Sequence, residues 1–110
     1  MTTLDEARAL ALALPETSEM AHHRITSFRI RDKIFATVPD QVHLRAMVDE
    51  AETRALAASE PGVYSEVYWG RRLACVQINL ASVTPEALRE VLVDAWRRKA
   101  PKRVARDHNL

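Results

Sequence analysis

The sequence of 110 residues is 47% hydrophobic and 28% charged with a formal net charge of +1, values typical of one globular domain, here residues 1–110. Its longest apolar run, ALALAL at 9–14, is far shorter than the roughly 20 residues that span a bilayer, and its single cysteine excludes an intrachain disulfide. Because the N-terminus shows no signal-sequence pattern, we expect a cytoplasmic protein whose small core leaves only a groove or a face for a ligand.

The first predicted elements are one helix and three strands. Thr3 and Glu6 have the spacing of a capping box, and apolar residues at intervals of three and four follow until Pro15 ends the helix. The segment PETSEMAHHR at 15–24 is interpreted as a polar loop. Alternating apolar and polar residues then predict strands at 25–30, 33–38 and 42–47, joined by short polar turns into a meander.

The second half adds a helix, two strands and a final helix. The segment DEAETRALAASE at 49–60 is rich in helix formers, and 63–80 predicts two strands with a turn at Gly70 and Arg71. In the second of these strands the alternation predicts that Ala74, Val76, Ile78 and Leu80 face the core. Thr84 and Pro85 are typical of a helix start, and Pro101 is expected to end or kink that helix. The order α-β-β-β-α-β-β-α predicts a two-layer α+β fold with a five-stranded antiparallel sheet and three helices.

Positive charge is concentrated at the C-terminal end. Residues 97–110 hold six of the 16 basic residues and one of the 15 acidic residues, which leaves ten basic and fourteen acidic residues in 1–96. This basic tail is expected either to follow a phosphate backbone or to be a frayed, solvated end. Its six cations are Arg97, Arg98, Lys99, Lys102, Arg103 and Arg106.

Several motifs resemble the MmcQ/YjbR family of small bacterial proteins. They are ALPET at 13–17, SFRIRDKIFA at 27–36, EPGVY at 60–64, VYWGRR at 67–72 and TPEALRE at 84–90, and they occur in the family's order over nearly the whole chain. The chain departs from the family at 71–78, RRLACVQI, where many members have an aromatic residue. The resemblance implies a two-layer fold with an antiparallel sheet and a DNA-binding role, but no catalytic residues.

One face of the predicted sheet is basic, polar and partly aromatic. Arginines on such a face can bind phosphates and an aromatic ring can stack on a base, although outward polar residues are also the default for a half-exposed sheet. The residues placed on it are Arg29, Arg31, His43, Arg45, Gln77 and Asn79, with Phe35 and Cys75 among them.

The aromatic residues of 63–69 fall on two faces of one predicted strand. Tyr64 and Tyr68 share a face and Trp69 takes the other, so one set should pack under the helices while the other projects outward or covers an edge. We interpret them mainly as core and edge packing, and keep Phe35 and Trp69 as candidates for stacking or partner contact.

No residue pattern predicts catalysis, a metal or a cofactor. His22 and His23 lack supporting cysteines or acids, Cys75 has no recognisable base and is expected to be a partly buried, inert thiol, and two glycines cannot form a phosphate-binding loop. As the resemblance implies, and in line with the clustered positive charge, we expect a non-enzymatic DNA-binding protein that uses Arg29, Arg31, Arg45 and the cations of the basic tail. The alternative is an interaction module that docks a protein partner or a second copy of itself through the open sheet face or an unpaired edge.

Overall fold

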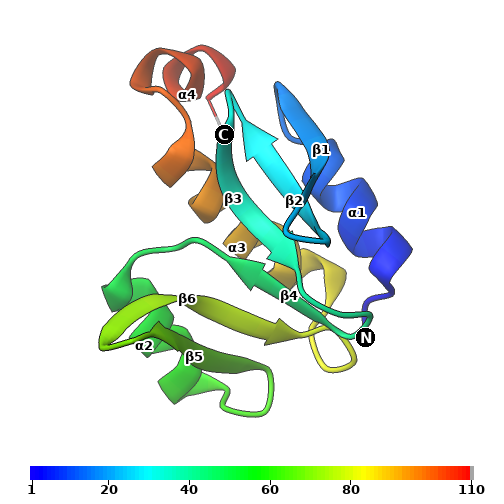
Figure 1. Ribbon diagram of the computed structural model, residues 1–110, viewed down its shortest axis with the longest axis vertical. Helices are drawn as coiled ribbons and strands as arrows, with labels where there is room; N and C mark the ends of the chain where they lie inside the picture. The colour runs from blue at the N-terminus through cyan, green and yellow to red at the C-terminus, as the bar shows by residue number, and fades with distance from the viewer. Residues whose placement is uncertain (110) are drawn as a thin grey trace.

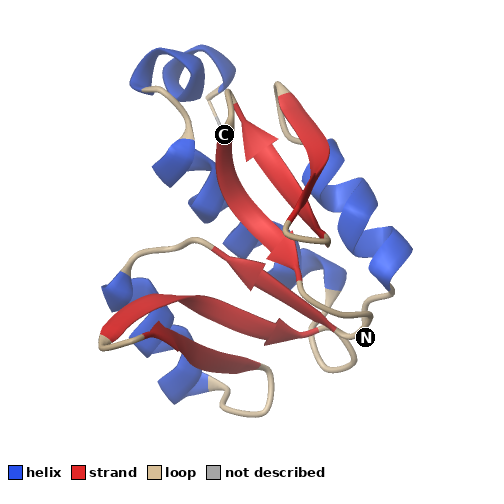
Figure 2. Cartoon of the chain, in the orientation of Figure 1, coloured by secondary structure: helices blue, strands red, loops and turns tan. Residues whose placement is uncertain are grey.

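The protein folds into a six-stranded antiparallel sheet with helices packed on one face (Figures 1 and 2). The structure is a computed structural model and describes residues 1–109, apart from the side chain of His22. The strand order is β1-β2-β3-β4-β6-β5. The strands are β1 (Thr17–His22), β2 (Ile25–Ile30), β3 (Lys33–Val38), β4 (His43–Ala46), β5 (Tyr64–Trp69) and β6 (Arg72–Asn79). The helices are α1 (Leu4–Leu12), α2 (Glu50–Ser59), α3 (Pro85–Lys99) and α4 (Lys102–His108).

The α+β class and the antiparallel sheet agree with the sequence prediction, but the element count does not. The described chain has six strands and four helices in place of five and three, because β1 lies in the segment interpreted as a polar loop and α4 lies in the basic tail. Strand β1 gives no alternating signal because it is an edge strand whose side chains are mostly exposed. Its turn into β2, His23 and Arg24, has positive φ at both residues without glycine or asparagine to mark it.

The helices begin where the sequence predicts them. In α1 the Thr3 hydroxyl accepts a hydrogen bond from the Glu6 backbone N–H at 3.1 Å, and the Glu6 carboxylate accepts one from the Thr3 N–H at 3.0 Å. At the start of α2 the Asp49 carboxylate accepts a hydrogen bond from the Glu52 N–H, and at the start of α3 the Thr84 hydroxyl accepts one from the Ala87 N–H. Pro101 separates α3 from α4, since Ala100 before it is extended and cannot continue the helix.

The hydrophobic core lies between the sheet and its helical layer. Helices α1 and α3 pack together, α3 also covers β3 and β4, and α2 covers β5 and β6 (Figure 1). On α3, Trp96 is fully buried and its indole N–H donates to the Pro15 carbonyl at 3.0 Å. Val104 anchors the short α4 to the same core. Among residues 1–109, no helix covers the other face of the sheet (Figure 1).

A β-bulge overturns the predicted position of Phe35. Phe28 pairs with Ala36 but Arg29 pairs with Ile34, so Phe35 is an extra residue in β3. The bulge turns Phe35 into the core, where it is 0% exposed, and moves Ile34 to the uncovered face. The prediction that Phe35 is available for stacking or for a partner is therefore wrong.

A second bulge changes the register of the β5–β6 hairpin. Val67 pairs with Cys75 but Tyr68 pairs with Leu73, which leaves Ala74 unpaired. Ala74, expected in the core, is half-buried on the uncovered face, while Val76 and Ile78 enter the core as the alternation predicts.

The sheet divides between β3 and β4. These strands pair only through Ala36 with Ala46 and Thr37 with Arg45, and one further bond joins the Met47 N–H to the Phe35 carbonyl at 2.9 Å. Beyond this short ladder the two halves of the sheet diverge (Figure 1). The divergence leaves space for a cavity between the two halves.

Candidate functional site

A cavity of about 690 Å³ opens where β3 and β4 diverge, and we call it the cleft. Its walls come from β3 and the turn before it, from the end of β4, from the β5–β6 hairpin and from the last residues of α3. Apolar side chains form much of the lining: Ile25, Ile34, Met47, Trp69, Leu73 and Ala74. The volume lies within the range of small-ligand sites in proteins.

Five cations share the cleft with two acids. The acids are Asp32 and Glu50, so the charged residues of the lining carry a formal net charge of +3. The cations come from four separate elements and their ends: Lys33, Arg45, Arg72, Arg98 and Lys99. Such a lining favours an anionic ligand.

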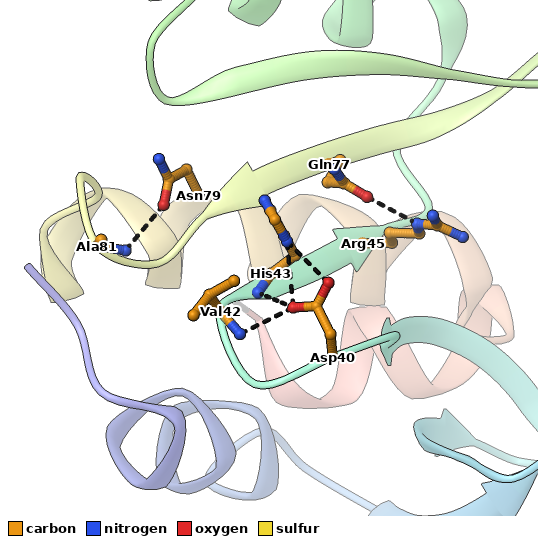
Figure 3. A network of polar contacts seen from close by, with 7 residues as sticks. All are labelled: Asp40, Val42, His43, Arg45, Gln77, Asn79 and Ala81. Carbon is orange, nitrogen blue, oxygen red and sulfur yellow. Dashed lines mark hydrogen bonds and ion pairs between the residues drawn. The ribbon is translucent and has the colours of Figure 1, made fainter.

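Two of the arginines are held in place by the protein. Arg45 donates from Nε to the Gln77 side-chain oxygen at 3.0 Å, across the β4–β6 pair (Figure 3). Arg98 donates from Nη1 to the carbonyls of Met47 and Val48, at 2.9 and 3.4 Å. Each guanidinium therefore uses one of its nitrogens on the protein, and its other N–H groups remain for a ligand.

None of the five cations of the cleft forms an ion pair with an acidic side chain among residues 1–109. Burial lowers the pKa of Lys99, and the neighbouring charges of Arg98, Lys33 and Arg72 lower this pKa further. Like charges thus crowd around Lys99, an arrangement that disfavours the unliganded fold and that a bound anion would relieve.

We expect Lys99→Met to stabilise the free protein. The folded-state pKa of Lys99 lies below its unfolded value, so the charged lysine penalises the fold at neutral pH, and the penalty disappears only above the unfolded pKa. Methionine keeps the aliphatic stem without the charge, so the free energy of unfolding should rise by about 0.5 kcal/mol at pH 7. Urea unfolding measures the change, and Lys102→Met on the exposed face of α4 is the control. A loss of stability in Lys99→Met alone would contradict the crowding.

Trp69 provides an aromatic wall at the edge of the cleft. It is 51% exposed, and the guanidinium carbon of Arg72 lies 5.4 Å from the centre of its ring. A cation over an indole face is an attractive contact that fixes the orientation of both groups. Trp69 is therefore available for the stacking or partner contact for which the sequence kept it as a candidate.

The structure brings together only part of the predicted basic set. Arg45, Arg98 and Lys99 line the cleft together with Lys33 and Arg72, neither of which was a candidate on the basis of the sequence. Both lie at the start of a strand, directly after the RD and GR hairpin turns. The basic turns were visible in the sequence, but the meeting of the two hairpins at one cavity was not.

The other predicted cations lie outside the cleft lining. Arg29 donates from Nε to the Ser27 hydroxyl at 3.2 Å, and Arg31 binds Glu16 with 2.6 Å between Nε and Oε1. Arg97 borders a separate shallow hollow on α3 with Arg89 and Asp94. The three remaining cations are exposed on α4: Lys102, Arg103 and Arg106.

Glu16 connects α4 to the β2–β3 turn. Its carboxylate accepts the bond from Arg31 and lies 3.5 Å from Nε2 of His108, and the hydrogen bond from Arg31 is the main cause that lowers the pKa of Glu16. Helix α4 is therefore attached at two points, since Val104 is buried as well. The expectation of a frayed end does not hold for residues 102–108.

The polar network near the start of β4 is structural. Asp40 accepts backbone N–H bonds from Val42 and His43 at 2.8 and 2.9 Å, and its Oδ2 lies 2.9 Å from Nδ1 of His43 (Figure 3). The contact with His43 is the first cause that lowers the pKa of Asp40. These bonds shape the turn into β4 and place His43 outside the cleft lining.

Cys75 has the environment of an inert thiol. It is 0% exposed, more deeply buried than the sequence prediction, and burial raises the pKa of its thiol, although the nearby charge of Arg45 acts in the opposite direction. A nucleophilic cysteine needs a lowered pKa and access to its substrate. Neither condition applies to Cys75.

A carboxyl pair joins α2 to α3. Burial raises the pKa of Glu52 to about 7, assisted by a hydrogen bond with Asp94 and by the charges of Asp94 and Asp49. Because the folded-state pKa lies above the unfolded value of 4.5, the pair stabilises the fold fully below pH 4.5, and this contribution is lost as the pH rises through 7.

We expect Glu52→Gln to raise the free energy of unfolding at pH 8 by about 1 to 2 kcal/mol and to leave it nearly unchanged at pH 5. Glutamine mimics the protonated acid and can still donate to Asp94. Chemical denaturation at the two pH values measures the difference, with Glu50→Gln in the first turn of the same helix as the control. An equal effect at both pH values would show that Glu52 does not hold a proton in the fold.

Two further findings bear on the range of functions. Within residues 1–109, no group of three or more His, Cys, Asp or Glu side chains is placed to hold a metal ion. None of the helices in this range is both long and apolar enough to cross a membrane.

The fold and the cleft define a two-layer α+β protein with a cationic cavity on the uncovered face of its sheet. The YjbR family model matches residues 12–98, so the chain belongs to the YjbR family, as the sequence motifs indicate. The fold is also similar to the crystal structure of Deinococcus radiodurans protein DR2400, family-model domain DUF419, with a TM-score of 0.77 and 21% sequence identity over 100% of this chain and 90% of that one. At this identity the likeness concerns the fold alone. A search of curated proteins gives no match.

Proposed function

We propose that the protein binds DNA by placing backbone phosphates against the cations of the cleft. The observation that carries the proposal is the gathering of five cations from separate elements around one cavity, without an acidic partner for any of them among residues 1–109. Their mutual repulsion is a cost to the free fold, and costs of this kind are typical of binding sites. A phosphate would offset the repulsion between these cations. Its oxygens would also accept hydrogen bonds from the free N–H groups of Arg45 and Arg98.

Helix α4 supports the same proposal from outside the cavity. Its Lys102, Arg103 and Arg106 follow α3 beyond Pro101, and α3 ends at the cleft with Lys99. A strand seated in the cleft could continue across this exposed basic helix. We therefore assign the main contact to the cleft and a secondary, less specific contact to α4.

The proposed activity is binding without catalysis. The support is chemical: the thiol of Cys75 is buried with a raised pKa, and neither Cys75 nor His43 lines the cleft. The residues that do line it are suited to hold an anion and a flat apolar group.

The docking alternative has lost one of its two supports. It relied on an exposed Phe35 and on unpaired edges, and Phe35 is buried. The edges are β1 and β5, which expose Met20 and Tyr68. Light scattering at several protein concentrations tests self-association, and a dimer lost on Tyr68→Arg would restore this alternative.

Fluorescence anisotropy of labelled single-stranded and duplex DNA tests the proposed function. The affinity should fall linearly with salt on a logarithmic scale, with a slope of about −0.7 for each phosphate contact on a single strand. If neither the single-stranded nor the duplex probe binds at low salt, the proposal is refuted.

A further inference from the structure

The cleft combines three features that one ligand would have to match. Its cations favour a compact anionic group, and its apolar lining favours an apolar part of the ligand that leaves water on binding. Trp69 adds an aromatic ring at the edge of the cleft. Arg72 lies over one face of this ring, so the Trp69 and Arg72 pair forms a flat surface on which a second planar group can stack.

The size of the cleft limits what can enter it. About 690 Å³ is the space of a small organic ligand, so a single nucleotide fits this scale and a duplex does not. Bases within a duplex are stacked and paired, and they reach a protein pocket only after they leave the stack. A base that enters the cleft must therefore belong to an unpaired nucleotide.

We propose that the cleft seats one unpaired nucleotide, with its phosphate on the cations around Lys99 and its base against Trp69 and Leu73. This inference rests on the proposed function for the strand to which the nucleotide belongs, but the pocket could equally take a free mononucleotide. It predicts a preference for single strands over duplexes. No such preference follows from charge alone.

The two tryptophans of the chain give a readout specific to the site. Trp69 lies at the cleft, whereas Trp96 is fully buried and its indole N–H donates a hydrogen bond to the Pro15 carbonyl. In a ¹H–¹⁵N spectrum of the full chain, adenosine 5′-monophosphate should shift the indole signal of Trp69 and leave that of Trp96 unchanged. The spectrum of Trp69→Phe assigns the two signals.

Four probes separate the phosphate from the base: adenosine 5′-monophosphate, adenosine, ribose 5-phosphate and inorganic phosphate. The mononucleotide should bind about 10-fold more tightly than any of the other three, because only it fills both parts of the site. Trp69→Ala should reduce the affinity for the mononucleotide by about 10-fold and leave the affinity for inorganic phosphate unchanged, since stacking on one aromatic ring contributes on this scale. Lys99→Met should reduce the affinity for both ligands.

The outcomes distinguish the inference from the proposed function. If single-stranded DNA binds but the mononucleotide binds no better than phosphate, or if Trp69→Ala leaves its affinity unchanged, the nucleotide site is refuted and DNA binding stands. If the mononucleotide binds with the expected dependence on Trp69 and Lys99 but DNA does not, the pocket stands as a site for free nucleotides and the proposed function is refuted. If neither DNA nor the mononucleotide binds, the nucleotide site and the proposed function are both refuted.

Discussion

Replacing Lys33, Arg72 and Lys99 together by glutamine is expected to reduce the affinity for single-stranded DNA on the order of 100-fold at low salt. These three cations surround the same part of the cleft, and the charges of the other two act on the pKa of Lys99. Loss of three phosphate contacts should also reduce the slope of log affinity against log salt by about 2. Anisotropy titrations at several salt concentrations measure both quantities.

The matched control removes the same charge from α4. Replacing Lys102, Arg103 and Arg106 by glutamine changes the net charge of the chain equally but leaves the cleft intact. We expect this variant to lose only a few-fold in affinity. Equal losses in the two variants would mean that binding depends on total charge and that the cleft has no special role.

Phe35→Ala is expected to cost about 3 to 4 kcal/mol of the free energy of unfolding, the largest single effect on stability that we predict. Phe35 is 0% exposed and belongs to the core cluster, so truncation leaves a cavity that the bulged strand cannot fill. Urea denaturation followed by circular dichroism gives the value.

Trp69→Ala is the comparison for Phe35→Ala, because both aromatic residues were candidates for stacking or partner contact on the basis of the sequence. With 51% of its surface exposed, Trp69 should contribute less than about 1 kcal/mol to stability. Comparable losses in the two variants, or a loss below about 1 kcal/mol for Phe35→Ala, would contradict the bulge in β3.

The difference between Phe35 and Trp69 shows what the alternating pattern could and could not predict. A period of two correctly places Val76 and Ile78 in the core, because regular pairing continues around them. It fails at Phe35 and Ala74, where each strand contains one extra residue opposite its partner. A bulge depends on the pairing of two strands, so the sequence of one strand does not reveal it.

Local sequence signals predicted the starts of the helices better than they predicted the peripheral elements β1 and α4. Thr3 and Thr84 act within one turn of their helices and accept the expected bonds, and Asp49, which was not selected as a cap, does the same for α2. Strand β1 depends instead on hydrogen bonds to β2, and α4 on the burial of Val104 and contacts with Glu16. Such tertiary contacts leave little trace in local composition.

Only some residues of the candidate site were among those selected from the sequence. Arg45, Arg98, Lys99 and Trp69 were candidates and line the cleft, yet Arg31 is paired with Glu16 and Arg97 lies at a different hollow. Lys33 and Arg72 enter the cleft because the sheet diverges beyond the short β3–β4 ladder. That divergence is a property of the whole sheet.

Photo-cross-linking locates the bound strand most directly. A single-stranded oligonucleotide that carries 5-iodouracil is irradiated with the full-length protein, and the attached peptide is identified by mass spectrometry. The cleft account predicts attachment within residues 67–73, at Trp69 above all, and its disappearance when adenosine 5′-monophosphate is in excess. Attachment confined to residues 102–108, unaffected by the mononucleotide, would contradict it and assign binding to α4.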